Sequence, residues 1–216
     1  MNYYTIDKNK ENVILDDTGF QVMMEWEKSY MEALVDNLNP VGDVLEIGFG
    51  LGYSARRILS KNIKSYTVIE SDKEALIRCR NLTNQSNIKV NIIEGEWQDQ
   101  LQTLGKFDSI FFDDAPSVNF PDPNNIRIYK FYYDVLEKHA KVGTKLTWYC
   151  DTAIYWLSNP FVSFSNNFYN VKISDDCKYI ETDTTLLSMP IVDYKFGIVS
   201  GMKRLALGNN FEVVEV

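Results

Sequence analysis

Asp43-Val44-Leu45-Glu46-Ile47 leads directly into Gly48-Phe49-Gly50-Leu51-Gly52, so a short apolar segment is followed by glycine at every second position. The apolar segment is typical of a buried β-strand. Glycine lacks a Cβ, which lets the backbone of the following turn approach a ligand closely. Residues 53–59 then have the composition of a helix. This order predicts the first strand–loop–helix unit of a nucleotide-binding α/β sheet.

The alternation of strand-like and helix-like segments continues along the chain. Further strands are predicted at 65–69, 88–93, 107–112 and 144–150, and helices at 73–82 and 126–139. Such alternation is typical of βαβ units, and hence of a doubly wound, mostly parallel sheet. Beyond residue 152 the pattern weakens, with strands predicted at 184–192 and 211–216. No internal repeat or linker divides the chain, so we expect a single domain over residues 1–216.

A different pattern precedes the first strand. The first 19 residues are polar and mixed, which indicates an arm or a short hairpin. From Phe20 to Leu38, apolar residues recur at steps of three and four, as on one face of an amphipathic helix. Asn39-Pro40 then ends the pattern. We therefore expect an N-terminal segment with its own helix ahead of the sheet.

Two nucleotide cofactors use a glycine-rich turn after the first strand, and residue spacing distinguishes them. Dinucleotides favour G-x-G-x-x-G, but the third glycine of that pattern would fall at Tyr53. Glu46, just before the loop, would repel a pyrophosphate and suits the ammonium group of a methionine moiety. Glu70 follows at the end of the second strand and can accept hydrogen bonds from the ribose hydroxyls of either cofactor. Together these residues favour S-adenosylmethionine over NAD.

Three acids share one kind of position in the predicted sheet. Glu46, Glu70 and Asp113 each lie at the carboxyl end of a strand. Because open α/β sheets bind ligands beyond the carboxyl ends of their strands, we expect these acids to line the ligand site.

Composition narrows the functional classes. The 216-residue chain has a formal net charge of −8 and no dense Lys/Arg run, which disfavours nucleic acid as a partner. Its three cysteines are far apart and form no C-x-x-C pair, so neither a disulfide framework nor a metal site is predicted. The N-terminus lacks the features of a signal peptide, and no apolar run is long enough to span a bilayer. We expect a cytoplasmic protein with no membrane partner.

Several of these segments together resemble guanidinoacetate N-methyltransferase, and the related fungal arginine methyltransferases carry a similar pattern. The resemblance covers roughly residues 20–150 and rests on Trp26-Glu27-Lys28-Ser29-Tyr30-Met31, Val44-Leu45-Glu46-Ile47-Gly48-Phe49-Gly50, Val68-Ile69-Glu70, Glu94-Gly95-Glu96-Trp97-Gln98-Asp99, Phe107-Asp108-Ser109-Ile110-Phe111-Phe112-Asp113 with Pro116, and Leu146-Thr147. It implies a class I S-adenosylmethionine-dependent methyltransferase with a seven-stranded, Rossmann-like sheet. Residues 1–40 would form an N-terminal helical lid segment, and the protein would be a monomer or a homodimer.

The resemblance also assigns site residues. The cofactor would be contacted by Met23, Met31, Glu46, Gly48, Phe49, Gly50, Glu70, Glu96, Trp97 and Asp113, with Trp97 beside the adenine. Glu27 and Asp113 would grip the guanidino group of a small-molecule acceptor. A guanidinium is a poor nucleophile because its pKa lies above about 12. Two carboxylates can bind its planar fork, and Asp113 can take its proton as the nitrogen attacks.

Two departures from the family keep other acceptors open. The family has Asp-Thr-Tyr-Pro where this chain has Asp113-Asp114-Ala115-Pro116, so Asp114 is an alternative base. After the fifth strand the chain has Cys150-Asp151-Thr152-Ala153 in place of Asn-Leu-Thr-Ser, and Asp151 would repel an acceptor's carboxylate. The alternatives to a creatine-forming enzyme are methyltransferases of a natural-product amine or hydroxyl, or of a protein arginine. An aminopropyltransferase or a non-catalytic cofactor-binding domain is less favoured.

Overall fold

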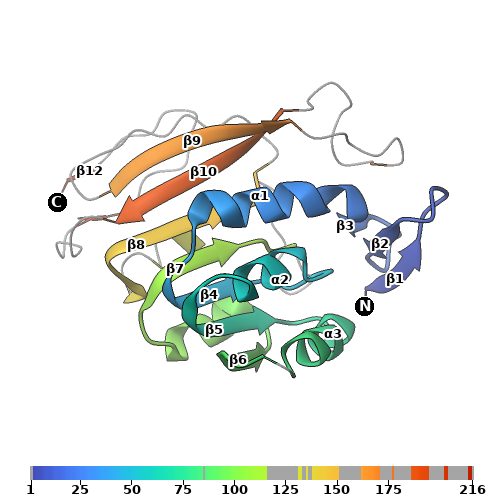
Figure 1. Ribbon diagram of the computed structural model, residues 1–216, viewed down its shortest axis with the longest axis horizontal. Coiled ribbons are helices and arrows are strands. Elements are labelled where there is room, and N and C mark those ends of the chain that lie inside the picture. The colour runs from blue at the N-terminus through green and yellow to red at the C-terminus, as the bar shows by residue number, and fades with distance from the viewer. Residues whose placement is uncertain are drawn as a thin grey trace.

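The strands predicted from the alternation form one sheet in the protein's structure, a computed structural model. The structure describes residues 2–84, 86–115, 131–132, 135, 138–150, 162–170, 177, 186–194, 202–203 and 214–215. Within these residues the sheet has seven strands in the order β6-β5-β4-β7-β8-β10-β9 (Figure 1). They are β4 (Gly42–Ile47), β5 (Ile63–Glu70), β6 (Lys89–Glu94), β7 (Phe107–Phe112), β8 (Ala140–Trp148), β9 (Val162–Asn170) and β10 (Leu186–Tyr194). Pairs among the first five are parallel, and β10 is antiparallel to both β8 and β9. The predicted mostly parallel sheet is confirmed.

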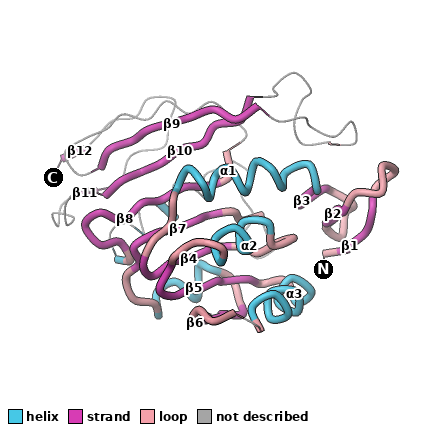
Figure 2. Tube along the Cα trace, in the orientation of Figure 1, coloured by secondary structure: helices cyan, strands magenta, loops and turns pink. Residues whose placement is uncertain are grey.

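Helices lie on both faces of this sheet. They are α1 (Lys28–Leu38), α2 (Tyr53–Leu59), α3 (Lys73–Thr83) and the short α4 (Trp97–Gln100), which runs into a 3-10 turn, η2 (Leu101–Thr103). In Figures 1 and 2, α1, α2 and α3 lie on the near side of the strands. Only parts of the helix predicted at 126–139 are described, and its residues 131, 132, 135 and 138 are helical.

The hydrophobic core is divided by the sheet into two clusters. Val44 of β4 packs in the cluster that holds the buried face of α1 and α2, while its neighbour Leu45 packs in the cluster that holds Trp97 of α4. The same alternation separates Val68 from Ile69 in β5. Successive side chains of a strand point to opposite faces, so near-continuous apolar strands bury both faces of the sheet.

The N-terminal segment departs from the prediction. β1 (Tyr3–Ile6), β2 (Asn12–Leu15) and β3 (Gln21–Met24) form a separate three-stranded antiparallel sheet. The predicted hairpin is confirmed, but a helix starting at Phe20 is wrong, since a 3-10 turn η1 (Glu25–Glu27) follows β3 and α1 begins at Lys28. The cause is the turn at Asp16, whose carboxylate accepts hydrogen bonds from the backbone N–H groups of Thr18 and Phe20. That turn reverses the chain and pairs β3 with β2.

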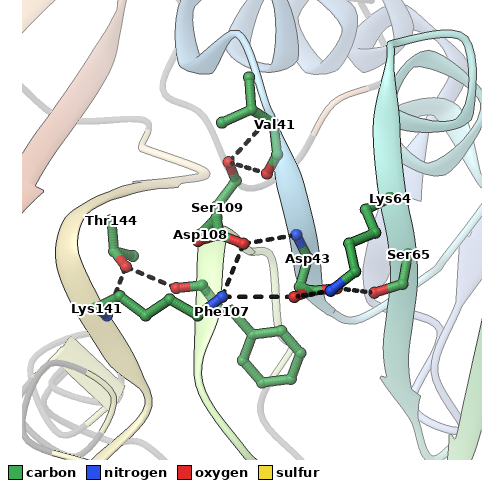
Figure 3. A network of polar contacts seen from close by, with 9 residues as sticks. All are labelled: Val41, Asp43, Lys64, Ser65, Phe107, Asp108, Ser109, Lys141 and Thr144. Atoms are coloured by element: carbon green, nitrogen blue, oxygen red, sulfur yellow. Dashed lines mark hydrogen bonds and ion pairs between the residues drawn. The ribbon is translucent and has the colours of Figure 1, made fainter.

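Charged side chains are paired at the amino end of the sheet (Figure 3). The carboxylate of Asp43 in β4 accepts hydrogen bonds from Ser65 Oγ (2.7 Å) and Lys64 Nζ (3.1 Å). In β7, Asp108 Oδ2 accepts from Lys141 Nζ (2.9 Å) and from the backbone N–H of Asp43 (2.8 Å). Lys141 also reaches Asp43 Oδ2 at 3.4 Å. These contacts connect the first residues of β4, β5, β7 and β8.

The C-terminal part of the chain adds strands that the sequence pattern indicated only in part. β10 confirms the strand predicted at 184–192, whereas β9 was not predicted. β11 (Met202–Lys203) and β12 (Val214–Glu215) form a separate antiparallel pair, and β12 lies within the strand predicted at 211–216.

Candidate active site

Three acids lie at the carboxyl end of the sheet, on three adjacent strands. Glu46 is the next-to-last residue of β4, Glu70 is the last of β5, and Asp113 directly follows β7. β4 lies between the other two strands, and the chain passes from it first to β5 and later to β7 on its opposite side. Such a reversal of strand order is where open α/β sheets bind ligands.

Gly48 is required by a close approach between two backbone segments. Its φ is +78°, and a Cβ at this position would lie 1.8 Å from the carbonyl oxygen of Asp113. Backbone hydrogen bonds from Gly48 N to Ile69 O (3.0 Å) and from Asp113 N to Ile47 O (2.9 Å) hold the three strand ends together. Any side chain at position 48 would push Asp113 away from the glycine loop.

The N-terminal sheet packs on the same loop. The sulfur of Met23 in β3 lies 3.2 Å from the backbone nitrogen of Leu51, and a Cβ on Gly50 would lie 2.8 Å from that sulfur. Tyr4 of β1 donates a hydrogen bond to Asp72, which caps the N-terminus of α3 just after Glu70. Met23, a predicted cofactor contact, therefore lies against the loop that the prediction assigns to the cofactor.

Glu70 organises the loop through backbone hydrogen bonds. Its Oε2 accepts from the N–H groups of Phe49 (2.7 Å) and Gly50 (3.4 Å), and its Oε1 accepts from those of Ser71 and Asp72 (both 2.7 Å). Burial raises the pKa of Glu70 above its usual value, although the backbone donors act in the opposite direction. Contact between Glu70 and the ribose stays a prediction.

Glu46 is enclosed behind the loop. Its side chain is 0% exposed, and its two oxygens accept hydrogen bonds from the hydroxyls of Ser54 and Tyr66. The pKa of Glu46 is raised to about 8: burial is the main cause, the negative charges of Asp113 and Glu70 also raise it, and the two hydroxyls act in the opposite direction. An acid in this setting holds its proton near neutral pH until a positive charge arrives.

This arrangement fits the predicted cofactor. S-adenosylmethionine carries positive charge on its sulfonium and ammonium groups, and a cation relieves the repulsion among neighbouring carboxylates. Glu46, Glu70 and Asp113 are close enough for the charges of the latter two to raise the pKa of Glu46. The three glycines let this loop pack closely against Asp113, Met23 and Phe49, which fixes it beside the acids.

Trp97 and Asp114 form a contact that separates two candidate bases. The indole Nε1 of Trp97 donates a 2.7 Å hydrogen bond to Asp114 Oδ2. Trp97 is 4% exposed and packs edge-on against Phe112 and Phe131, with ring centroids 5.8 and 5.2 Å away. Asp114 is thus oriented by Trp97, and Asp113 stays the predicted base. Contact between Trp97 and the adenine also stays a prediction.

Glu27 is the last residue of η1 and directly precedes α1. It is 3% exposed, and its Oε1 accepts a 2.6 Å hydrogen bond from the backbone N–H of Met24. Its charge reaches Tyr53, the first residue of α2, because burial and then the carboxylates of Glu25 and Glu27 raise the pKa of Tyr53. The structure therefore brings Glu27 close to the end of the glycine loop.

The remaining predicted contacts come from α1, the glycine loop and the residue before α4. Met31 is fully buried within α1, and Phe49 is buried with its ring against Gly52. Glu96 is half-buried, and its carbonyl oxygen accepts the first backbone hydrogen bonds of α4. Contact of these three with the cofactor stays a prediction. Pro116 and Asp151 lie outside the described residues.

Sequence reasoning missed the partners that hold Glu46. Ser54 is the second residue of α2, and Tyr66 lies on β5 opposite Val44. A buried tyrosine hydroxyl needs a hydrogen-bond partner, so a tyrosine inside an apolar strand is a signal for a buried polar contact. Nothing in the spacing of the chain indicates that this partner is Glu46.

The strand order, the glycine loop at its reversal point and the three acids fit a class I S-adenosylmethionine-dependent methyltransferase. The family profile described as guanidinoacetate N-methyltransferase matches residues 3–159, and the chain belongs to that family. The predicted family, enzyme class and cofactor are confirmed.

Curated relatives match a smaller part of the chain. Protein arginine N-methyltransferase 2 of Candida glabrata is 34% identical over 109 residues, which are 48% of this chain and 26% of that protein. The Debaryomyces hansenii protein of the same name is 28% identical over 142 residues, 59% of this chain and 32% of its own length. The chain thus spans about a quarter to a third of the curated relatives it matches.

Solved structures share the fold at low sequence identity. Spermidine synthase from Thermotoga maritima has a TM-score of 0.57 at 15% identity, covering 99% of this chain and 80% of that one. An O-methyltransferase from Bacillus cereus, solved with SAH, has a TM-score of 0.52 at 16% identity, covering 78% of this chain and 80% of that one.

Among the described residues, no helix is both long and apolar enough to cross a membrane.

Proposed function

We propose that this protein transfers a methyl group from S-adenosylmethionine to a guanidino nitrogen of a small molecule. Guanidinoacetate, which would give creatine, is the first candidate. The observation that carries this proposal is the meeting of Glu46, Glu70 and Asp113 at one edge of the sheet, in a chain of the guanidinoacetate N-methyltransferase family. A cationic acceptor suits this edge because its charge is attracted by carboxylates.

The chain's own residues would bind and orient the reactants. S-adenosylmethionine, when bound, supplies an electrophilic methyl group. Gly48 and Gly50 would allow the loop backbone to lie against it, with Glu70 at the ribose and Glu46 at the methionine ammonium. Methyl transfer is a displacement that depends on alignment, so fixing the acceptor nitrogen supplies most of the acceleration.

Asp113 is the residue we assign as the base. Its backbone is fixed on both sides, by the hydrogen bond from its N–H to Ile47 and by the contact of its carbonyl oxygen with Gly48. A carboxylate in that place would bind the guanidinium by charge-assisted hydrogen bonds and accept its proton as the nitrogen attacks. Asp114 is the weaker candidate because its carboxylate accepts the indole N–H of Trp97.

Glu27 would provide the second carboxylate. It is held at the start of α1 by Met24, close to the first residue of α2. Residues 1–40 would act as the lid segment, and the contacts of Met23 with Leu51 and of Tyr4 with Asp72 support this role. Closure over the acceptor would exclude water and strengthen the attraction between the acids and the guanidinium.

A protein arginine is the second candidate acceptor. It is favoured by the relatives named protein arginine N-methyltransferase 2, one of which is 34% identical over 109 residues. An arginine side chain presents the same guanidinium. Unlike guanidinoacetate, it has no carboxylate close to that group, so Asp151 would not repel it. A monomer or homodimer, a cytoplasmic location and the absence of nucleic acid as a partner stay predictions.

The proposal is tested by measuring S-adenosylhomocysteine release with a matched panel of acceptors. The panel contains guanidinoacetate, free arginine, an arginine-containing peptide, and glycine as an amine without a guanidino group. We expect turnover with a guanidino compound and none with glycine, and mass spectrometry of the product should show one added methyl group. Turnover with glycine alone, or with no member of the panel while the cofactor still binds, would contradict the proposal.

A further inference from the structure

Tyr30 has no role in the chemistry proposed above, although it lies in the same motif as Glu27 and Met31. Its side chain comes from α1 and is fully buried. The hydroxyl lies 3.0 Å from the carbonyl oxygen of Cys150 and 2.5 Å from that of Ser188, and it accepts a 3.1 Å hydrogen bond from Cys150 N. A hydroxyl has one proton and two lone pairs, so this one group serves backbone atoms from two separate segments.

Those two segments would face each other if the ladder between β8 and β10 continued. Leu146 pairs with Val192, and the same register carried onward would place Cys150 opposite Ser188. Among the described residues the pairing stops at Leu146. Pro190 of β10 has no N–H to donate, and its carbonyl oxygen instead accepts a 2.6 Å hydrogen bond from Thr147 Oγ1. At the next pair of that register, the Tyr30 hydroxyl bridges the backbones of Cys150 and Ser188.

The end of β8 is held on its other side by β7. Tyr149 N donates a 3.0 Å hydrogen bond to the carbonyl oxygen of Phe112, the residue before Asp113. The rings of Tyr30 and Tyr149 also meet edge to face, with centroids 5.6 Å apart. The chain leaving β8 is therefore fixed between α1 and the end of β7, and the proposed base Asp113 is the residue that follows β7.

We propose that Tyr30 is a positioning residue that sets the spacing between the two acids expected to hold the guanidino group. The inference rests on the proposed function for the roles of those acids. Glu27 lies three residues before Tyr30, at the start of the same helix, and Asp113 follows Phe112. Tyr30 and Tyr149 thus connect α1 to β7 through the end of β8. The hydrogen bonds from Phe49 and Gly50 to Glu70 are separate from this connection.

The test compares two variants of the full chain, each of which loses one hydroxyl that bonds to the backbone where the end of β8 faces β10. This region is called the seam between β8 and β10. Tyr30→Phe keeps the ring and its contact with Tyr149 but removes the bonds to Cys150 and Ser188. Thr147→Val removes the bond to Pro190 and leaves Cys150 held. Michaelis constants for the acceptor, dissociation constants for S-adenosylhomocysteine, and hydrogen exchange of the Cys150 amide are measured for both variants and the wild type.

We expect Tyr30→Phe to raise the KM for the acceptor about five- to twentyfold, because a small displacement of binding groups weakens an aligned complex. The dissociation constant of S-adenosylhomocysteine should rise less than the KM, since the hydrogen bonds from the glycine loop to Glu70 are kept. Exchange of the Cys150 amide should become faster in Tyr30→Phe and not in Thr147→Val. Tyr30→4-aminophenylalanine, which restores a donor at the same place, should recover most of the KM.

Two results would overturn the inference: a KM that rises no more in Tyr30→Phe than in Thr147→Val, or an unchanged exchange rate at Cys150. Loss of stability alone would affect both variants, and saturating S-adenosylmethionine in the acceptor assay, which stabilises the folded state by mass action, keeps a weakened variant measurable. If the wild type methylates no guanidino compound, the proposed function fails. The exchange rate at Cys150 then decides by itself whether Tyr30 holds the end of β8.

Discussion

The two ends of β4 carry acids in opposite electrostatic settings. At the amino end, hydrogen bonds from Ser65 and Lys64 are the main cause that lowers the pKa of Asp43 to about 2. At the carboxyl end, the pKa of Glu46 is raised to about 8, mainly by burial, and the charges of Asp113 and Glu70 that act on it are also negative. The acid at the amino end stabilises the fold, whereas the one at the carboxyl end is held at a cost that a cationic ligand would offset.

β7 shows the same contrast between its two ends. Asp108 near its start is bonded to Lys141, while Asp113 just beyond its end is placed against the glycine loop. The two aspartates at the ends of β7, Asp108 and Asp113, can therefore be compared by making the same substitution at each. A substitution at the carboxyl end should change cofactor binding or turnover, and its counterpart at the amino end should change stability.

The largest effect is expected for Asp113→Asn. Loss of a positioned general base lowers turnover by about 10²- to 10⁴-fold, while S-adenosylhomocysteine binding changes little. Steady-state kinetics and calorimetry measure the two quantities. Asp108→Asn, at the other end of β7, is the control and should keep its turnover. Equal losses of turnover in both variants would remove the distinction between the two ends.

Gly48→Ala should weaken cofactor binding by about 10- to 100-fold. A Cβ at position 48 would lie 1.8 Å from the Asp113 carbonyl oxygen, so the loop or the end of β7 must shift. Gly42→Ala is the control, because its φ is also positive and the three atoms nearest to its Cβ would all belong to the Asp108 side chain. Calorimetric titration should show normal cofactor affinity in Gly42→Ala together with a lower melting temperature. Normal affinity in Gly48→Ala would argue against the loop as the cofactor site.

Glu46→Gln should change how stability depends on pH. The raised pKa of Glu46 means that the folded state binds a proton that the unfolded state releases between pH 4.5 and about 8. This contribution is complete below pH 4.5 and is lost as the pH rises towards 8, with a slope of at most about 1.4 kcal/mol per pH unit. Urea unfolding at several pH values should show a flatter profile for Glu46→Gln. A profile identical to that of the wild type would show that Glu46 ionises normally.

The smallest effect is expected at the amino end, for Lys141→Met. The lysine is 37% exposed and Asp108 is 31% exposed, so loss of their ion pair should lower the free energy of unfolding by only about 0.5 to 1 kcal/mol. The kinetic constants should not change. Chemical unfolding and the acceptor assay check both statements, and a lowered turnover would show that the two ends are coupled.

The parallel core of the fold was predictable because local pattern and topology agree there. The bounds of β7 and α2 match the predicted segments 107–112 and 53–59. Glu46, Glu70 and Asp113 were predicted to lie together because parallel strands bring their carboxyl ends to the same edge.

Features that depend on distant contacts were not predictable from spacing. The apolar residues of β3 also fit a helical period, and its pairing with β2 depends on the turn at Asp16. The contacts of Glu46 with Tyr66 and of Trp97 with Asp114 join residues 20 and 17 positions apart on separate elements. The seam bridged by Tyr30 joins residues 120 positions apart or more. No local pattern encodes such pairs.

The most direct test of the account is an NMR titration of the Glu46 side-chain carboxyl carbon, with and without S-adenosylmethionine. We expect a Glu46 pKa near 8 in the free protein, because the group is buried beside two other acids. The cofactor's positive charge should then lower that pKa by at least one unit. A Glu46 pKa near 4.5 in the free protein, or one that the cofactor leaves unchanged, would contradict the claim that this end of the sheet is built for a cation.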